Sequence, residues 1–175
     1  MRGLAASRLA TIAVSAVALA CSGANPTTSS SPYVATSPSR AQPTSGGCGS
    51  TQARVGAVPA WLDAAAGHNV PQLPYVIAVP ASAAGFLFAR PLRAGHPENP
   101  SNKILWVVRT PRQGSSLEVD GHPLGSAGPI VHQSQPADSF PGEIYPSIID
   151  VPTPGCWRFT LQWATGRAEV DLNYV

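Results

Sequence analysis

The chain has 175 residues, abundant proline and glycine, few charged side chains and a formal net charge of +2. Two of the basic residues lie in an N-terminal segment that we expect to be removed, which leaves nine basic against nine acidic residues. A near-neutral chain of this length allows one domain with tails, and it argues against nucleic-acid binding, which needs a net or clustered positive charge.

Residues 1–20 have the three parts of an export signal: basic residues, an apolar run, and small residues before a cysteine. The apolar run is shorter than the roughly 20 residues that a membrane span needs. The stretch Ala18-Leu19-Ala20-Cys21 resembles the lipobox of bacterial lipoproteins. This resemblance implies that the signal is cut before Cys21, which then carries the acyl chains of a membrane anchor. The alternative is an ordinary cleavable signal that leaves Cys21 as a free thiol.

A linker rich in serine, threonine and proline follows Cys21 and extends to residue 47. Such a composition cannot bury enough apolar surface to offset the entropy of ordering, so residues 21–47 are predicted to be disordered. The prolines favour an extended chain. We expect this linker to hold a folded domain away from the membrane.

The chain has three cysteines, so one is left over if two of them form a disulfide. Acylation of Cys21 would leave Cys48 and Cys156 as an even pair, and we predict that these two residues are bonded. The folded domain is then expected over residues 48–175.

Short strand-like runs alternate with turn signals through this domain. A short helix is expected at 58–67, where alanines favour it and Gly67 can end it. The expected strands are 75–79, 85–89, 103–109, 117–120, 129–132, 145–151, 156–163 and 168–175. This pattern predicts an all-β fold, an immunoglobulin-like β-sandwich of about seven or eight strands, with a small barrel as the alternative.

The stretch 145–163 reads as a strand, a proline-rich turn and a second strand. Side chains alternate between the two faces of a strand. In the second strand the apolar face, which we predict to be core, consists of Trp157, Phe159, Leu161 and Trp163. Thr165-Gly166 is a turn signal that predicts a hairpin between the last two strands.

Four stretches carry a resemblance to known proteins: NKILWVVR at 102–109, PR at 111–112, PSII at 146–149 and PGCWRFTL at 154–161. Through them, residues 73–175 resemble a group of uncharacterised secreted proteins and lipoproteins from high-GC Gram-positive bacteria. The resemblance implies an all-β extracytoplasmic domain. It implies no established activity and transfers no catalytic residue.

Basic residues cluster in the middle of the domain, at Arg90, Arg93, Lys103, Arg109 and Arg112. The first two follow one predicted strand, and the next two bracket the following strand. If these strands pair, we expect the five residues to gather at one edge as a candidate patch for an anionic ligand. Such a ligand would be wall polymer, lipid headgroups or an acidic protein. The alternative is that the charges protect the sheet edge and keep the protein soluble.

No catalytic residue, metal site or cofactor is predicted. The four histidines are His68, His96, His122 and His132, and none has the spacing of a local zinc motif. The Gly125–Gly128 stretch lacks the strand–turn–helix context of a nucleophile elbow.

The sequence therefore predicts a lipid-anchored protein on the extracytoplasmic face of a bacterial cell membrane, displaying a β-sandwich that acts as a binding or structural module. Two alternatives remain. A small envelope hydrolase would need a pocket where a histidine, a carboxylate and a serine or glutamate converge, and it would be supported by two of His96, His122 and His132 lying within ligand distance of each other. A carrier of an apolar ligand would need a cavity between the sheets.

Overall fold

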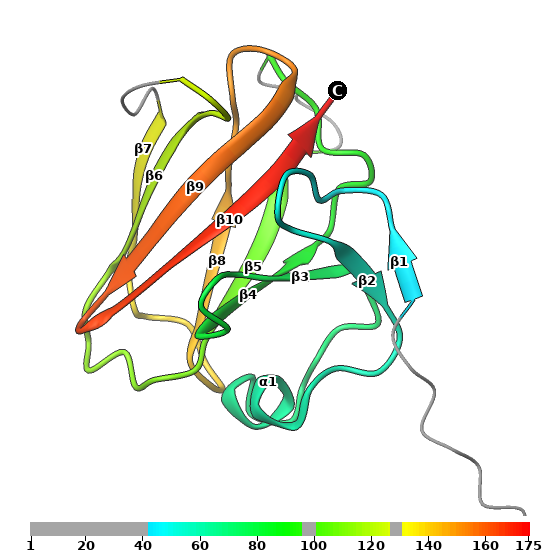
Figure 1. Cartoon of the computed structure of the whole chain (residues 1–175). Helices are drawn as coiled ribbons and strands as arrows, with labels where there is room; N and C mark the ends of the chain where they lie inside the picture. Colours follow the sequence, from blue (N-terminus) through cyan, green and yellow to red (C-terminus); the bar gives the residue numbers. More distant parts are fainter. Residues whose placement is uncertain (1–41, 96–100, 127–130) are drawn as a thin grey trace, which may run out of the picture. The chain divides into compact units, whose positions relative to one another are not determined.

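The computed structural model describes residues 42–95, 101–126 and 131–175, which belong to one compact unit, Ser37–Val175 (Figure 1). The elements in chain order are β1 (Gln42–Thr44), β2 (Ala53–Val55), α1 (Ala60–Ala65), β3 (Tyr75–Ile77), β4 (Ala83–Leu87), β5 (Lys103–Val108), β6 (Leu117–Pro123), β7 (Val131–Gln135), β8 (Ile144–Ile148), β9 (Gly155–Trp163) and β10 (Gly166–Tyr174). In the described ranges, no helix combines the length and the apolar character needed to cross a bilayer.

The strands form two antiparallel sheets, with the orders β1-β2-β3-β4-β5-β8 and β10-β9-β6-β7. This confirms the predicted all-β sandwich. The strands do not close into a barrel, because each sheet keeps two edge strands. Strands β1 and β2 were not expected, since three residues are too few to show alternation. Strand β1 (Gln42–Thr44) also lies within the predicted linker 21–47, so the folded part includes residues before Cys48.

The β9–β10 hairpin confirms the predicted core face. Its nine paired positions run from Trp163 opposite Gly166 to Gly155 opposite Tyr174. The buried residues of the two strands are Trp157, Phe159, Leu161, Trp163, Ala168, Val170, Leu172 and Tyr174. A Cβ atom on Gly166 would lie 2.2 Å from the ring of Trp163, so only glycine fits at this first position of β10.

Two apolar clusters hold the layers together. The larger lies between the sheets and includes Ile104, Trp106 and Val108 of β5 together with the core face of the hairpin. The smaller lies on the outer face of the six-stranded sheet, where Leu62 and Ala66 at α1 pack against other buried residues: Tyr75, Phe86 and Val107. Helix α1 therefore covers only a part of that outer face.

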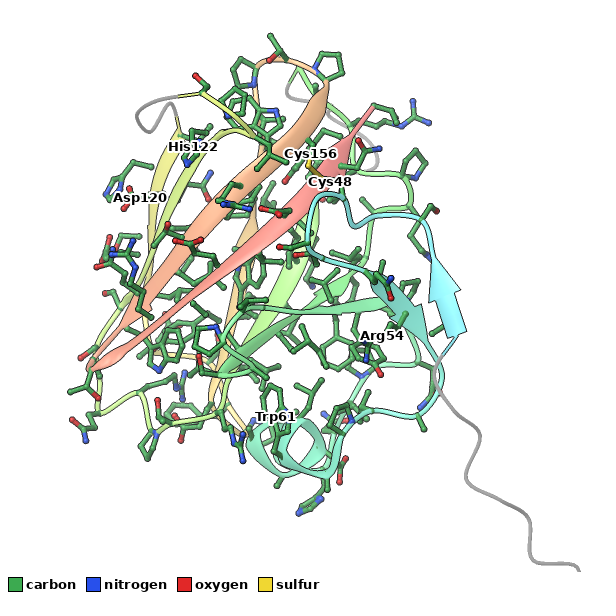
Figure 2. The ribbon with its side chains drawn as sticks, viewed as in Figure 1. Cys48, Arg54, Trp61, Asp120, His122 and Cys156 are labelled. Carbon is green, nitrogen blue, oxygen red and sulfur yellow. A yellow bond between two sulfur atoms is a disulfide. The ribbon has the colours of Figure 1, made fainter. Side chains whose placement is uncertain are left out.

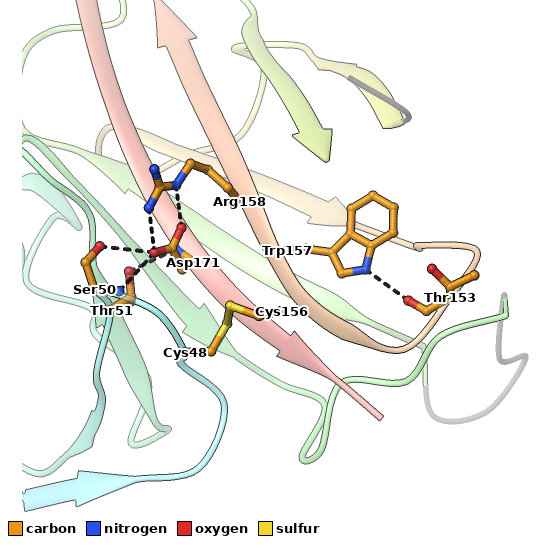
Figure 3. Close-up of a disulfide and its surroundings, with 8 residues drawn as sticks. All are labelled: Cys48, Ser50, Thr51, Thr153, Cys156, Trp157, Arg158 and Asp171. Atoms are coloured by element: carbon orange, nitrogen blue, oxygen red, sulfur yellow. Dashed lines mark hydrogen bonds and ion pairs between the residues drawn. A yellow bond between two sulfur atoms is a disulfide. The ribbon is translucent and has the colours of Figure 1, made fainter. Parts of the chain in front are cut away.

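Loops close the free edge of β10. Isolated bridges join this strand to Gly47, Val79 and Leu92, which come from three separate loop segments. The predicted disulfide between Cys48 and Cys156 is confirmed, with the two Cα atoms 5.9 Å apart. It fastens the N-terminal segment to β9 (Figure 3).

Candidate functional site

An apolar surface remains uncovered on the outer face of the six-stranded sheet. Residues 104, 106 and 108 of β5 point into the core, so alternation directs Lys103 and Leu105 outward. On the neighbouring strand β8, Ile148 lies opposite Lys103 and Pro146 lies opposite Leu105. Phe88 directly follows β4 and lies beside Lys103, because its N–H donates to the carbonyl of Lys103 at 3.0 Å. We call the surface formed by Phe88, Lys103, Leu105, Pro146 and Ile148 the β5/β8 face.

The β5/β8 face exposes large apolar side chains that a folded protein normally buries. Phe88 is 38% exposed and Ile148 is 49% exposed, and Pro146 beside them is also exposed. The ammonium group of Lys103 lies 4.7 Å from the centre of the Phe88 ring, a cation–π contact. The face therefore combines exposed apolar surface with a positive charge.

A groove of about 520 Å³ adjoins this face, lined by Lys103, Gln135, Pro146, Ser147 and Ile148. The Ser147 hydroxyl already donates to the carbonyl of Ile104 at 3.1 Å. The Gln135 amide donates to the side chain of Gln133 at 3.3 Å. Lys103 therefore supplies the main cationic donor that faces the groove.

Strand β8 is an edge strand, and its free edge is poorly suited to pairing with a further strand. The N–H of Ile149 donates to the carbonyl of Asn102 at 3.1 Å, and the N–H of Val108 donates to the carbonyl of Glu143 at 3.0 Å. The odd-numbered residues of β8 therefore bond to β5, and the even-numbered ones turn their backbone groups toward the free edge. Pro146 is one of these even-numbered residues and has no N–H group. An incoming peptide strand would therefore find a missing donor at the middle of β8.

The five basic residues predicted to gather at one edge do not do so. Strands β4 and β5 pair as expected, but Leu87 lies opposite Ile104 and Ala83 lies opposite Val108. The residues before β5 and those after it therefore lie at opposite ends of the pair, about 20 Å apart at 3.3 Å per residue. Arg90, Arg93 and Lys103 lie at one end. Arg109 and Arg112 lie at the other.

Arg112 is a buried structural residue. Its backbone N–H and Nε donate to Glu143 Oε2 at 2.7 and 3.2 Å, and its Nη1 donates to the carbonyl of Ile144 at 2.7 Å. The rings of Phe140 and Tyr145 lie 5.4 and 5.3 Å from its guanidinium carbon. Because these contacts occupy the guanidinium group, Arg112 is not part of an anion-binding surface.

The other residue at that end, Arg109, is exposed. Its guanidinium carbon lies 5.8 Å from the centre of the Trp61 ring. Trp61 lies on α1 (Figure 2). Arg109 therefore stands beside the helix, far from the β5/β8 face.

A histidine and two carboxylates lie together on the outer face of the other sheet. His132 Nδ1 is 2.7 Å from Asp120 Oδ1, and its Nε2 is 3.6 Å from Glu118 Oε2. The hydrogen bond to Asp120 raises the pKa of His132, against a smaller opposing effect of burial. Ser134 donates to Glu118 at 2.6 Å rather than to the imidazole, so the group lacks a nucleophile positioned on its histidine.

The remaining histidines do not join this group. His122 lies on β6 beside Asp120, but its Nδ1 faces the carbonyl of Pro123 at 3.0 Å (Figure 2). His68 pairs with Asp63 at 2.6 Å. His96 lies outside the described residues. Among the residues that the structure describes, no group of three or more histidine, cysteine, aspartate or glutamate side chains could hold a metal ion.

An ion pair between Arg158 and Asp171 lies beside the disulfide and was not predicted from the sequence. Asp171 is 1% exposed and accepts hydrogen bonds from Arg158 Nε at 2.7 Å and Nη2 at 3.0 Å (Figure 3). The backbone N–H and hydroxyl of Ser50 also donate to it, each at 3.0 Å. Burial opposes ionisation, but these hydrogen bonds outweigh it, so the pKa of Asp171 lies below its ordinary value. The hairpin register, which places Arg158 opposite Asp171, was the signal that could have revealed the pair.

A second hollow, of about 380 Å³, lies at β2 and β3, toward the edge of the six-stranded sheet that is far from β8. It includes one exposed cation, Arg54 of β2 (Figure 2). It also includes one strongly exposed apolar side chain, Val79. It therefore offers a smaller version of the same chemistry, and its side chains are matched controls for the β5/β8 face.

Comparisons of the chain with protein-family models, with curated proteins and with solved structures found no match.

Proposed function

We propose that this protein is anchored to the extracytoplasmic face of a bacterial cell membrane through acylated Cys21, and that its β-sandwich is a binding module for the cell envelope. The observation that carries the binding role is the β5/β8 face, where exposed apolar side chains, an adjoining groove and Lys103 occur together. Large exposed apolar patches usually mark surfaces that contact a partner or a membrane.

The cysteine pairing supports the proposed location. A disulfide between Cys48 and Cys156 is expected in an oxidising compartment, as outside the cytoplasm. With Cys48 and Cys156 bonded to each other, the third cysteine of the sequence is Cys21, the residue that the lipobox resemblance identifies for acylation. Two or three acyl chains would give stable anchoring where one is marginal.

The packing supports binding at the surface rather than carriage of an apolar ligand between the sheets. Trp106, Trp157 and Phe159 are at most 1% exposed and fill the space between the two layers. An interior ligand would have to displace these side chains, whereas the β5/β8 face is accessible as it stands.

Fractionation of cells that produce the protein tests the anchor. The wild-type protein should stay with the membrane through a high-salt wash, which screens electrostatic surface binding. The Cys21→Ala variant should leave the membrane under the same wash. A variant with both Cys48→Ala and Cys156→Ala keeps Cys21 and controls for general effects of cysteine loss. Equal retention of the Cys21→Ala variant would contradict the proposal.

A further inference from the structure

Three cations lie at the same end of the β4–β5 pair as the exposed apolar side chains. Arg90, Arg93 and Lys103 are all exposed, and none of them makes an ion pair with another residue in the described part of the chain. Phe88 and Ile148 lie beside one of them, Lys103. Lys103 therefore combines a charge that no described residue neutralises with the apolar surface of Phe88 and Ile148.

The position of Arg93 is fixed by a buried side chain. Asn102, which is fully buried, accepts a hydrogen bond from the Arg93 N–H at 2.8 Å and donates to the Arg93 carbonyl at 2.7 Å. Asn102 directly precedes Lys103 in the chain. The backbone of Arg93 is thus held at the start of β5, close in space to the backbone of Lys103.

Three kinds of partner differ in what they would use here. A soluble polyanion would use the cations but would leave Phe88 and Ile148 exposed to water. A peptide strand added to β8 would meet the missing N–H group of Pro146. A lipid surface would use both features, because apolar side chains enter the boundary between headgroups and acyl chains while lysine and arginine side chains reach the lipid phosphates.

We infer that the β5/β8 face, together with Arg90 and Arg93, docks the domain on an anionic lipid surface. The arrangement of Lys103 over the Phe88 ring suits this role, since the apolar stem can follow the ring into the interface while the ammonium group stays at the headgroups. This inference rests on the proposed anchoring. A tether at Cys21 keeps the domain at a high effective concentration near the membrane, so a weak docking surface is sufficient.

The test uses residues 37–175, which contain every described element, the core and the disulfide but lack Cys21. Their binding is measured by flotation with vesicles of phosphatidylcholine, with and without phosphatidylglycerol. We expect binding to the anionic vesicles that declines as salt is raised. A basic residue near an anionic membrane contributes about 1 kcal/mol, so Arg93→Gln and Lys103→Gln should each lower the partition coefficient about fivefold. The Phe88→Ser and Ile148→Ser pair should lower it by a similar factor or more.

Matched controls come from the second hollow, where Arg54→Gln removes an exposed cation and Val79→Ser removes an exposed apolar side chain. Both should leave the partition coefficient within about twofold of wild type, and thermal melting should show that all variants are folded. A control effect as large as that of the β5/β8 variants would overturn the inference, because it would indicate unspecific adsorption.

Two other outcomes would also overturn it. One is the failure of wild-type 37–175 to bind anionic vesicles at low salt. The other is binding to soluble polyphosphate as tight as to vesicles, with no effect of the Phe88→Ser and Ile148→Ser pair, which would identify a polyanion as the ligand. Because residues 37–175 lack Cys21, neither outcome bears on acylation, and the loss of acylation would leave vesicle binding unchanged.

Discussion

Arg158 and Asp171 face each other across the β9–β10 hairpin, with the Nε of Arg158 2.7 Å from the Oδ1 of Asp171. Ser50 approaches the same carboxylate from the N-terminal segment, next to the disulfide of Cys48. The ion pair and the disulfide therefore fasten the entry of the folded chain to its last two strands, which makes this region structural rather than a ligand site.

Loss of the Asp171 charge should destabilise the domain. Asp171→Asn keeps the shape of the side chain but leaves Arg158 without its buried counter-ion. We expect a decrease of about 2–4 kcal/mol in the free energy of unfolding, since Arg158 keeps partial access to water. Denaturant unfolding of residues 37–175 measures this. The exposed Asp138→Asn is the control and should change stability by less than about 0.5 kcal/mol. Equal stabilities of the two variants would contradict this account of the pair.

The same pair should make stability depend on pH in the acid range. Because the folded state lowers the pKa of Asp171, its contribution is present above the ordinary carboxyl pKa of about 3.9 and is lost as the pH falls through the lower pKa of the folded state. The difference in stability between wild type and Asp171→Asn should thus be constant from about pH 5 to 7 and shrink below about pH 4. A difference that grows on acidification would show that another group dominates.

The disulfide should contribute strongly to stability. It closes a loop with a sequence separation of 108 residues. On the chain-entropy account, a loop of about 100 residues gives about 4.7 kcal/mol, although native-state strain and residual structure often reduce the measured value. The variant with Cys48→Ala and Cys156→Ala should therefore unfold at a much lower denaturant concentration than the oxidised wild type. Reduced wild type should behave like the double variant, and unchanged midpoints would contradict the prediction.

Arg112 and Arg109 should behave differently although they are three residues apart. Arg112→Gln removes the partner of Glu143 from a buried site and should cost about 2–3 kcal/mol of stability. Arg109→Gln removes an exposed contact with Trp61 and should change stability by less than about 1 kcal/mol. Thermal and denaturant unfolding distinguish them. Neither residue lies on the β5/β8 face, so a folded variant of either should keep its vesicle binding.

His132 should titrate above the ordinary histidine pKa of about 6.5. The hydrogen bond to Asp120 is the main cause of the raised pKa, so Asp120→Asn should lower the midpoint of the His132 ring resonances followed by NMR. Ser134→Ala, which removes a hydroxyl that contacts Glu118 instead, should shift the midpoint less. A His132 midpoint that does not respond to Asp120→Asn would show that the pair does not form in solution.

Alternation along the strands was sufficient to predict the sandwich and much of its core. Trp157, Phe159, Leu161 and Trp163 alternate with polar residues, and this pattern depends only on the strand backbone. The disulfide followed from cysteine number rather than from geometry. Short strands such as β1 have too few residues to show alternation, so the domain was predicted to begin only at Cys48.

The candidate site depended on relationships that a linear sequence does not contain. Basic residues close in sequence were separated because antiparallel pairing places Lys103 and Arg109 at opposite ends of β5. The burial of Arg112 required the loop that brings Glu143 to it. The exposure of Phe88 and Ile148 depends on how far α1 extends over the sheet, which no local pattern specifies.

The measurement that tests the central claim most directly is the intact mass of the protein extracted from the membranes of cells that produce it. The account predicts a chain that begins at Cys21, with the added mass of two or three acyl chains on that residue and with Cys48 bonded to Cys156. An unmodified Cys21, or wild-type protein recovered mainly from the medium, would contradict it.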